Sequence, residues 1–134
     1  MKVLLCGDNY LLMRLIQEEL ASENYEIRLV DLESDIIQQI DDFEPDMLIT
    51  NILISQLNGF ELIQYARTKF PKILIIVLSA LSAKRLVELS YRLGADDFIS
   101  MPFDPERLSI RIKKLIHQKQ SSLIFNVSTY ASSI

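Results

Sequence analysis

Apolar residues follow two alternating patterns along the chain. Short apolar or β-prone runs, most of them continuous, are typical of strands buried on both faces of a sheet. Between them lie longer segments in which apolar residues recur every three to four positions, the period of an amphipathic helix. The predicted strands are residues 3–6, 26–30, 47–50, 73–78 and 98–99. The predicted helices are residues 10–23, 34–43, 60–70, 83–93 and 104–118, and the first is expected to bury Leu11, Leu12, Leu15, Ile16 and Leu20.

Residues that cap or break helices support these boundaries. Either Asp8 or Asn9 suits the N-cap of the first helix, and we expect Asp8 to act as a cap rather than as a metal ligand. Gly94 suits the position directly after a helix end. Asp104 followed by Pro105 is a typical helix start.

Five strands that alternate with five helices predict an α/β fold with a parallel sheet. Right-handed crossovers then place helices on both faces, which gives a doubly wound sandwich. In such sheets, functional residues lie at the carboxyl ends of the strands. The residues to consider there are Gly7, Asp8, Asn51, Ser79 and Met101.

Composition narrows the class of protein. The 134 residues suggest one domain, and a net charge of −4 argues against a domain that binds nucleic acid on its own. The single cysteine, Cys6, excludes an internal disulfide, fits a reducing compartment and lies in an apolar run that predicts burial. No apolar run approaches the roughly 18 residues of a membrane span. We therefore expect a cytoplasmic domain that makes no membrane contact.

Several sequence blocks resemble the receiver domain of response regulators in two-component signalling. They are KVLLCGDN at residues 2–9, PDMLITNI at 45–52, NGFEL at 58–62, VLSA at 77–80 and GADDFISMPF at 94–103. The resemblance covers about residues 2–117 and implies a flavodoxin-like (βα)5 sandwich with strand order 2-1-3-4-5. It places the domain at residues 1–118, and it is nearest to the winged-helix DNA-binding subfamily.

The resemblance also implies a pocket from which the family's chemistry has been lost. The family has two acidic residues after the first strand, a phospho-accepting aspartate after the third and a lysine after the fifth. This chain has Gly7-Asp8, Asn51 and Met101 at those places, and only Asp8 and Ser79 keep the family's residue type. An amide is no carboxylate nucleophile, one carboxylate is a poor Mg²⁺ site, and methionine supplies no cation for a phosphoryl group.

These substitutions predict a receiver with no catalytic residues, no metal and no cofactor. We expect it to signal through protein contacts, independently of phosphorylation, as the regulatory half of a transcription regulator that reaches DNA only through an output domain outside this chain. Two alternatives remain: a conventional phospho-receiver with a displaced acceptor, and a small-ligand module that uses the neutral pocket. We expect Met101 to fill that pocket and Ser79 to bond nearby backbone.

Further expectations concern the rest of the site and the surface. Phe98 matches the family's switch aromatic, and Met101-Pro102 matches a peptide bond that is typically cis. The resemblance implies a homodimer through helix 4, strand 5 and helix 5, with a partner regulatory protein as another possibility. The ion pairs of that dimer would come from Lys84, Arg85, Asp96, Asp97, Arg107 and Arg111.

The last residues, 119–134, read as a strand-like extension or as the start of a linker or output domain. In residues 121–134 the apolar Phe125 and Val127 alternate with polar neighbours, which is typical of a strand. Such a strand needs a partner edge. It could begin an output domain, be exchanged between protomers, or be an extension held by neighbouring molecules.

Overall fold

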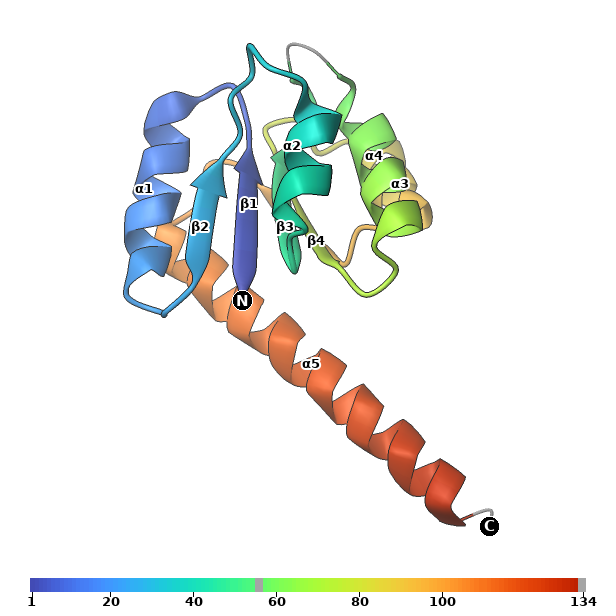
Figure 1. Cartoon of the computed structure of the whole chain (residues 1–134). Helices are drawn as coiled ribbons and strands as arrows, with labels where there is room; N and C mark the ends of the chain where they lie inside the picture. Colours follow the sequence, from blue (N-terminus) through green and yellow to red (C-terminus); the bar gives the residue numbers. More distant parts are fainter. Residues whose placement is uncertain (55–56, 133–134) are drawn as a thin grey trace.

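The computed structural model describes residues 1–54 and 57–132, with side chains described up to residue 120. A five-stranded parallel sheet in the order β2-β1-β3-β4-β5 carries helices on both faces, as predicted (Figure 1). The strands are β1 (Lys2–Cys6), β2 (Glu26–Leu29), β3 (Met47–Asn51), β4 (Leu74–Ser79) and β5 (Asp97–Ser100). The helices are α1 (Tyr10–Ala21), α2 (Ile36–Phe43), α3 (Gly59–Lys69), α4 (Lys84–Leu93) and α5 (Pro105–Ser132).

Alternate residues of the inner strands pack into two separate hydrophobic layers. Leu4, Leu48 and Ile75 lie in one layer, which contains apolar residues of α2 and α3. Their chain neighbours Leu5 and Ile49 lie in the other layer, which contains residues of α1 and α5. Since both faces are covered, a strand has no polar face, which explains why β1, β3 and β4 read as continuous apolar runs.

Side-chain caps set several helix starts. Asn9 and Asp35 accept hydrogen bonds from the backbone N–H groups of Leu12 and Gln38 at the starts of α1 and α2. The prediction that Asp8 caps α1 was therefore wrong, because Asn9 stands one residue nearer to the helix. The cap at Asp104 is confirmed, since its side chain accepts a hydrogen bond from Glu106 N–H.

The buried face of α1 is rotated from the predicted one. Met13, Ile16 and Leu20 are buried, whereas Leu11 and Leu15 are 70% and 46% exposed. The first turns of α1 are apolar nearly all round, so spacing alone did not determine which side faces the sheet. Met13 fills that role, and this places its thioether beside the carboxyl end of β1.

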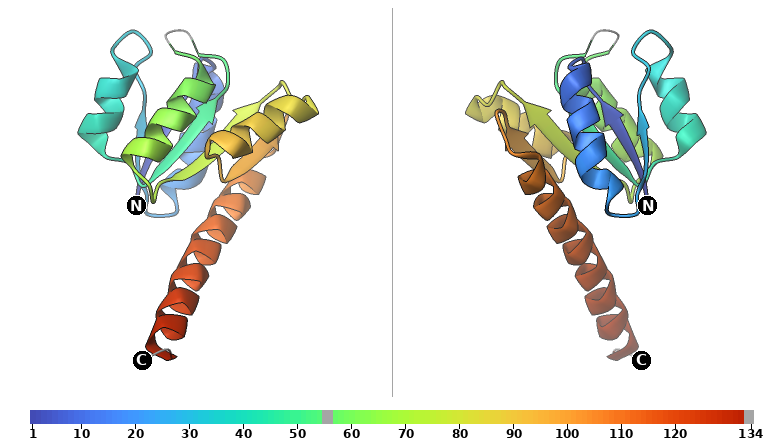
Figure 2. Two further views of the ribbon diagram at one scale, coloured as in Figure 1. Left: turned by 90° about the vertical axis from the view of Figure 1, so that its right-hand side faces the viewer. Right: turned by 90° about the vertical axis from the view of Figure 1, so that its left-hand side faces the viewer.

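The extension that follows residue 118 continues α5 as a helix to Ser132, so the predicted strand was wrong there. A strand needs a partner to pair its backbone groups, whereas a helix pairs them internally. This part of α5 runs past the edge of the sheet and away from the body of the domain (Figure 2). The final two residues lie outside the described residues.

None of the described helices is long and apolar enough to cross a membrane.

Candidate functional site

The strands bring the five predicted pocket residues to one end of the sheet, where Asn51, Ser79 and Met101 line one pocket and Gly7 lies beside Asn51. Register pairs join Cys6 to Thr50, Asn51 to Leu78 and Ser79 to Ser100, so the residues that follow these strands meet. A shallow pocket of about 130 Å³ lies there, lined by Asn51, Ile52, Leu53, Leu78, Ser79, Ala80, Leu81 and Met101.

Asp8 does not join this pocket. Its side chain is exposed, and it lines a different hollow between α1 and the segment that follows β2, together with Tyr10 and Met13. Asp8 is the one carboxylate that the family pattern retains at this end of the sheet. Its position leaves the pocket beside Asn51 without an acidic lining residue.

Gly7 shows how the space of the missing acidic residue is used. A Cβ atom at Gly7 would lie 2.9 Å from Asn51 Nδ2, 2.9 Å from Met13 Cε and 3.2 Å from Met13 Sδ. Both side chains therefore occupy the volume into which a longer residue at position 7 would extend. The sequence did not single out Met13, because methionine on a helix is an ordinary core residue.

Asn51 presents a neutral amide at the end of β3. Its Oδ1 is buried and has no hydrogen-bond partner within the described residues. Leaving a buried acceptor unpaired costs about 1–3 kcal/mol, so this oxygen destabilises the corner. Its neighbour Thr50 donates a hydrogen bond from Oγ1 to the Asn51 carbonyl oxygen, at 2.9 Å.

Ser79 and Met101 are tied to backbone around the pocket. The N–H of Leu81 donates to Ser79 Oγ at 2.9 Å, as expected for a serine that bonds nearby backbone. The N–H of Met101 donates to the Ser79 carbonyl oxygen at 2.9 Å. Met101 is half-buried, lines the pocket and precedes Pro102 through a cis peptide bond, which confirms the predicted geometry of that corner.

These residues do not fit a Mg²⁺ ion. Magnesium prefers several hard oxygen ligands in an octahedron, usually with one or two carboxylates. Here the lone carboxylate of Asp8 is exposed and outside the pocket, and Met13 fills the space beside Gly7. Within the described part of the chain, no group of three or more His, Cys, Asp or Glu residues is placed to hold a metal.

Phe98 lies in the sheet rather than at the pocket. It is 9% exposed and belongs to the hydrophobic layer on the α3 side, where Ala95 and the half-buried Val87 also lie. Its ring is therefore directed inward.

The predicted dimer face already contains ion pairs within one chain. Asp97 is 6% exposed and accepts from Arg111 Nε at 2.6 Å and from Arg111 Nη2. Hydrogen bonding to Asp97 raises the pKa of the Arg111 guanidinium.

The other residues predicted for this face are partly paired. Asp96 pairs with Arg67 at 2.8 Å, and Lys84 lies 3.9 Å from Glu88. Arg85 and Arg107 are exposed and form no ion pair in the part of the chain that the structure describes. The symmetric dimer stays a prediction.

Cys6 sits inside the sheet, as predicted from its apolar run. It is fully buried, and this burial raises the pKa of its thiol to about 12. The thiolate is the reactive form of cysteine, so Cys6 is chemically inert in the folded chain.

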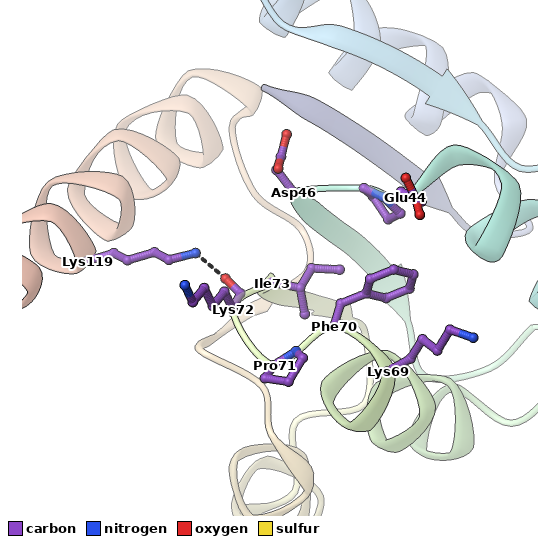
Figure 3. A pocket seen from close by; sticks show the side chains of 9 residues that line it. Glu44, Asp46, Lys69, Phe70, Pro71, Lys72, Ile73 and Lys119 are labelled. Carbon is purple, nitrogen blue, oxygen red and sulfur yellow. Dashed lines mark hydrogen bonds between the residues drawn. The ribbon is translucent and has the colours of Figure 1, made fainter.

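A larger hollow, of about 560 Å³, lies at the opposite end of the sheet (Figure 3). Sequence reasoning did not identify it, because its lining comes from two separate segments, residues 44–46 and 69–73, and from Lys119 of α5. Glu44 and Asp46 line one part of it, and Lys69, Lys72 and Lys119 line another. The amino group of Lys119 donates to the Lys72 carbonyl oxygen, so this lysine anchors α5 to the turn before β4.

Comparison with known proteins gives one consistent result. Residues 3–113 match the family model of the response regulator receiver domain. The response regulator ArlR of Staphylococcus epidermidis is 31% identical over 130 residues, which span 94% of this chain and 57% of that protein. The transcriptional regulatory protein GltR of Pseudomonas aeruginosa is 28% identical over 88% of this chain and 50% of its own length. The chain thus spans about half the length of the curated relatives it matches.

Solved structures show the same fold. A CheY-like receiver domain protein from Methanospirillum hungatei superposes with a TM-score of 0.83, at 20% identity, over 90% of this chain and 97% of that one. The beryllofluoride-activated receiver domain of DrrB superposes with a TM-score of 0.76, at 21% identity, over 87% of this chain and 97% of that one.

Proposed function

This chain belongs to the response regulator receiver domain family, and from that premise we propose that it is a receiver that regulates through protein contacts without accepting a phosphoryl group. It acts in the cytoplasm as the regulatory part of a transcription regulator. The names of relatives such as GltR support the role in transcription. DNA is then reached through a domain outside this chain, because the receiver itself is acidic.

One observation carries the proposal: the side chains that remain have taken over the space of the lost ones. Asn51 and Met13 occupy the volume beside Gly7, so neutral side chains fill the space into which an acidic residue at position 7 would extend. Several carboxylates without a metal would repel one another in one cleft. The changes to glycine, asparagine and methionine remove charge of both signs together, which supports a pocket adapted to holding neither metal nor phosphoryl group.

The absence of a phosphoryl group changes how such a domain is regulated. A ligand shifts a two-state equilibrium only by its difference in affinity for the two states. Without a phosphoryl group, the balance between the two states is set by the sequence itself or by a bound protein. The inward position of Phe98 and the Ser79–Leu81 hydrogen bond are consistent with one arrangement held by the fold itself.

The test is incubation with acetyl phosphate and Mg²⁺, followed by intact mass spectrometry, with a conventional receiver domain treated in parallel. We expect the mass of this chain to stay unchanged while the conventional receiver gains one phosphoryl group. A gain of one phosphoryl group on this chain would contradict the proposal and would support a displaced acceptor instead. The residue concerned would be found by peptide mapping.

The small-ligand alternative has less support from the pocket. Ligand sites usually enclose about 300–1,000 Å³ with several convergent polar groups. The pocket beside Asn51 holds about 130 Å³, and Ser79 Oγ is already bonded to Leu81 N–H.

A further inference from the structure

Charge is divided unevenly along the chain. Residues 1–61 contain thirteen of the 18 Asp and Glu residues but only three of the 14 Lys and Arg residues. The rest of the chain contains eleven basic and five acidic residues. No charged residue lies at 55–56 or 121–134, so the structure describes the surroundings of every one of them.

The strand order turns this division into a separation in space. Strands β2 and β1, with α1 and α2, lie toward one lateral edge of the sheet. Strands β4 and β5, with α4 and the start of α5, lie toward the opposite lateral edge (Figure 2). Strands lie about 4.8 Å apart, so the two outer strands are separated by roughly 19 Å. This distance is about twice the Debye length at 0.1 M salt, so charges at the two outer strands barely influence one another. Helix α5 itself reaches the acidic side, where Lys113 pairs with Glu23.

The acidic edge is defined here as the exposed carboxylates around β2 and α2. Its members are Glu26, Asp31, Glu33, Asp35, Asp42 and Glu44. None of them forms an ion pair within the described residues, and the nearby Arg28 lies over the ring of Phe43, 4.4 Å from its centroid. Arg28 keeps its charge there and offsets one of the six carboxylates, so this edge presents an excess of negative charge.

The basic edge is defined here as the exposed cations of α4 and α5. Its members are Lys84, Arg85, Arg92, Arg107, Lys113 and Lys114. Lys113 pairs with Glu23, and Lys84 lies near Glu88. On the same side of the molecule Asp96 and Asp97 are bound by Arg67 and Arg111, whereas the exposed Asp104 and Glu106 at the start of α5 form no ion pair within the described residues. Arg85, Arg92, Arg107 and Lys114 form no ion pair in the described part of the chain, so this edge keeps an excess of positive charge.

A symmetric dimer places the same surface patch of both copies together. Through the basic edge, such a dimer would bring Arg85, Arg107 and Lys114 toward a second set of the same cations, and like-charge contacts disfavour association. Two exposed carboxylates on this side, Asp104 and Glu106, form no ion pair within the described residues, and they offset only part of this repulsion. The acidic edge, by contrast, offers a surface of matching opposite charge on the same chain.

We propose that this chain associates with itself head to tail, with the basic edge of one copy docked on the acidic edge of the next. The partner is a second copy because both complementary surfaces lie on the same chain. Such a heterologous contact adds further copies unless its rotation closes a ring. It would let this receiver assemble without a phosphoryl group, but it does not depend on how the pocket behaves.

The test is sedimentation velocity of the full chain at about 0.01 M and about 1 M salt, where the Debye length falls from about 30 to about 3 Å. We expect the mean mass at low salt to rise with concentration to at least twice the monomer mass of 15.5 kDa, and to return to monomer at high salt. A monomer at both salts, or a dimer that resists salt, would overturn the proposal.

Two sets of charge reversals identify the surfaces. The triple variant E26K/E33K/D42K cancels the net charge of the six members of the acidic edge, and R85E/R92E/K114E cancels that of the six members of the basic edge. Each variant alone should remain monomeric at low salt, and an equimolar mixture of the two should associate again. A mixture that stays monomeric would contradict the proposal. Binding of duplex DNA to the basic edge, by a chain that does not self-associate, would also contradict it.

Folding of each variant is checked by circular dichroism. If a reversed variant fails to fold, the corresponding neutral set replaces it: E26Q/E33Q/D42Q or R85Q/R92Q/K114Q. Either neutral set should weaken the low-salt association at least tenfold, and an unchanged association constant would count against the proposed surfaces.

Discussion

At the scale of single residues, position 7 and its neighbours explain why the pocket looks as it does. Strand ends in a parallel sheet gather at one edge, so Gly7, Asn51, Ser79 and Met101 could be predicted from the sequence to lie close together. The role of Met13 could not, because it depends on the rotation of α1 about its axis. The choice between Asp8 and Asn9 as the cap stayed open for a similar reason, since one residue of offset decides which side chain meets Leu12 N–H.

Two glycines provide a matched comparison of crowding. A Cβ at Gly59 would lie 2.4 Å from the Asn51 carbonyl oxygen and 2.5 Å from that of Ile52, both of which are backbone. A Cβ at Gly7 would meet the ends of side chains, which can move. We expect Gly59→Ala to lower the free energy of unfolding by about 1–3 kcal/mol and Gly7→Ala to lower it by clearly less. Urea unfolding of both variants is the measurement, and equal losses would contradict the packing described.

Cys6 gives a prediction about pH. Its pKa of about 12 in the folded chain exceeds that of a thiol in an unfolded chain, about 8.5, so the folded state holds its proton more tightly. The Cys6 contribution to stability is therefore fully present below pH ~8.5 and is lost as the pH rises toward 12. The free energy of unfolding should be measured for Cys6→Ala and for the unchanged chain at several pH values. Between pH 8 and 10 it should fall less for the variant than for the unchanged chain. An identical slope would contradict this account.

At the scale of elements, helices and strands followed the periodicity closely, and the largest difference came where tertiary partners decide. The alternation of Phe125 and Val127 predicts a strand only if a neighbouring edge is present. Without one, the chain continues α5, because the helix pairs its own backbone. The periodicity of apolar residues therefore predicted the helices and strands that pack in the core, and it gave the wrong structure for the segment after residue 118, which lies beyond the core.

The extension of α5 should contribute little to the stability of the domain. The α5 residues in the core, Leu108 and Ile112, lie in its first turns, and isolated helices shorter than about 12–15 residues are marginal in water. Ending the chain after residue 120 should shift the melting temperature by less than about 2 °C. The variant Ile112→Ala is the control and should cost about 2–5 kcal/mol. A large loss on truncation would show that the extension packs on the domain.

Arg67 connects three elements and should matter more than its place near the surface suggests. Its guanidinium donates to the carbonyl oxygens of Gly94, Pro71 and Ile73 and pairs with Asp96 at 2.8 Å. Removing these donors leaves partly buried acceptors unpaired, so Arg67→Ala should lower the free energy of unfolding by about 2–4 kcal/mol. The exposed Lys69→Ala, on the same helix, should cost less than about 0.5 kcal/mol. Chemical denaturation distinguishes the two.

At the scale of the whole molecule, the fold could be predicted almost completely, whereas the use of its surface could not. Strand order follows from the alternation of elements together with the family resemblance, and both concern the buried part of the chain. Which cations are free depends on contacts such as Arg111 with Asp97, which spacing along the chain does not reveal. The division into an acidic and a basic edge needed both the charge counts and the sheet order.

The central claim is that the pocket at the carboxyl ends of the strands holds neither metal nor phosphoryl group. The most direct measurement is a titration with Mg²⁺ and beryllofluoride, a phosphoryl mimic, followed by the amide NMR signals of the chain. We expect the signals of Gly7, Asn51, Ser79 and Phe98 to stay in place, since Met13 and Asn51 fill the space beside Gly7 and Met101 supplies no cation. Saturable shifts of these signals, at concentrations that saturate a conventional receiver, would contradict the account.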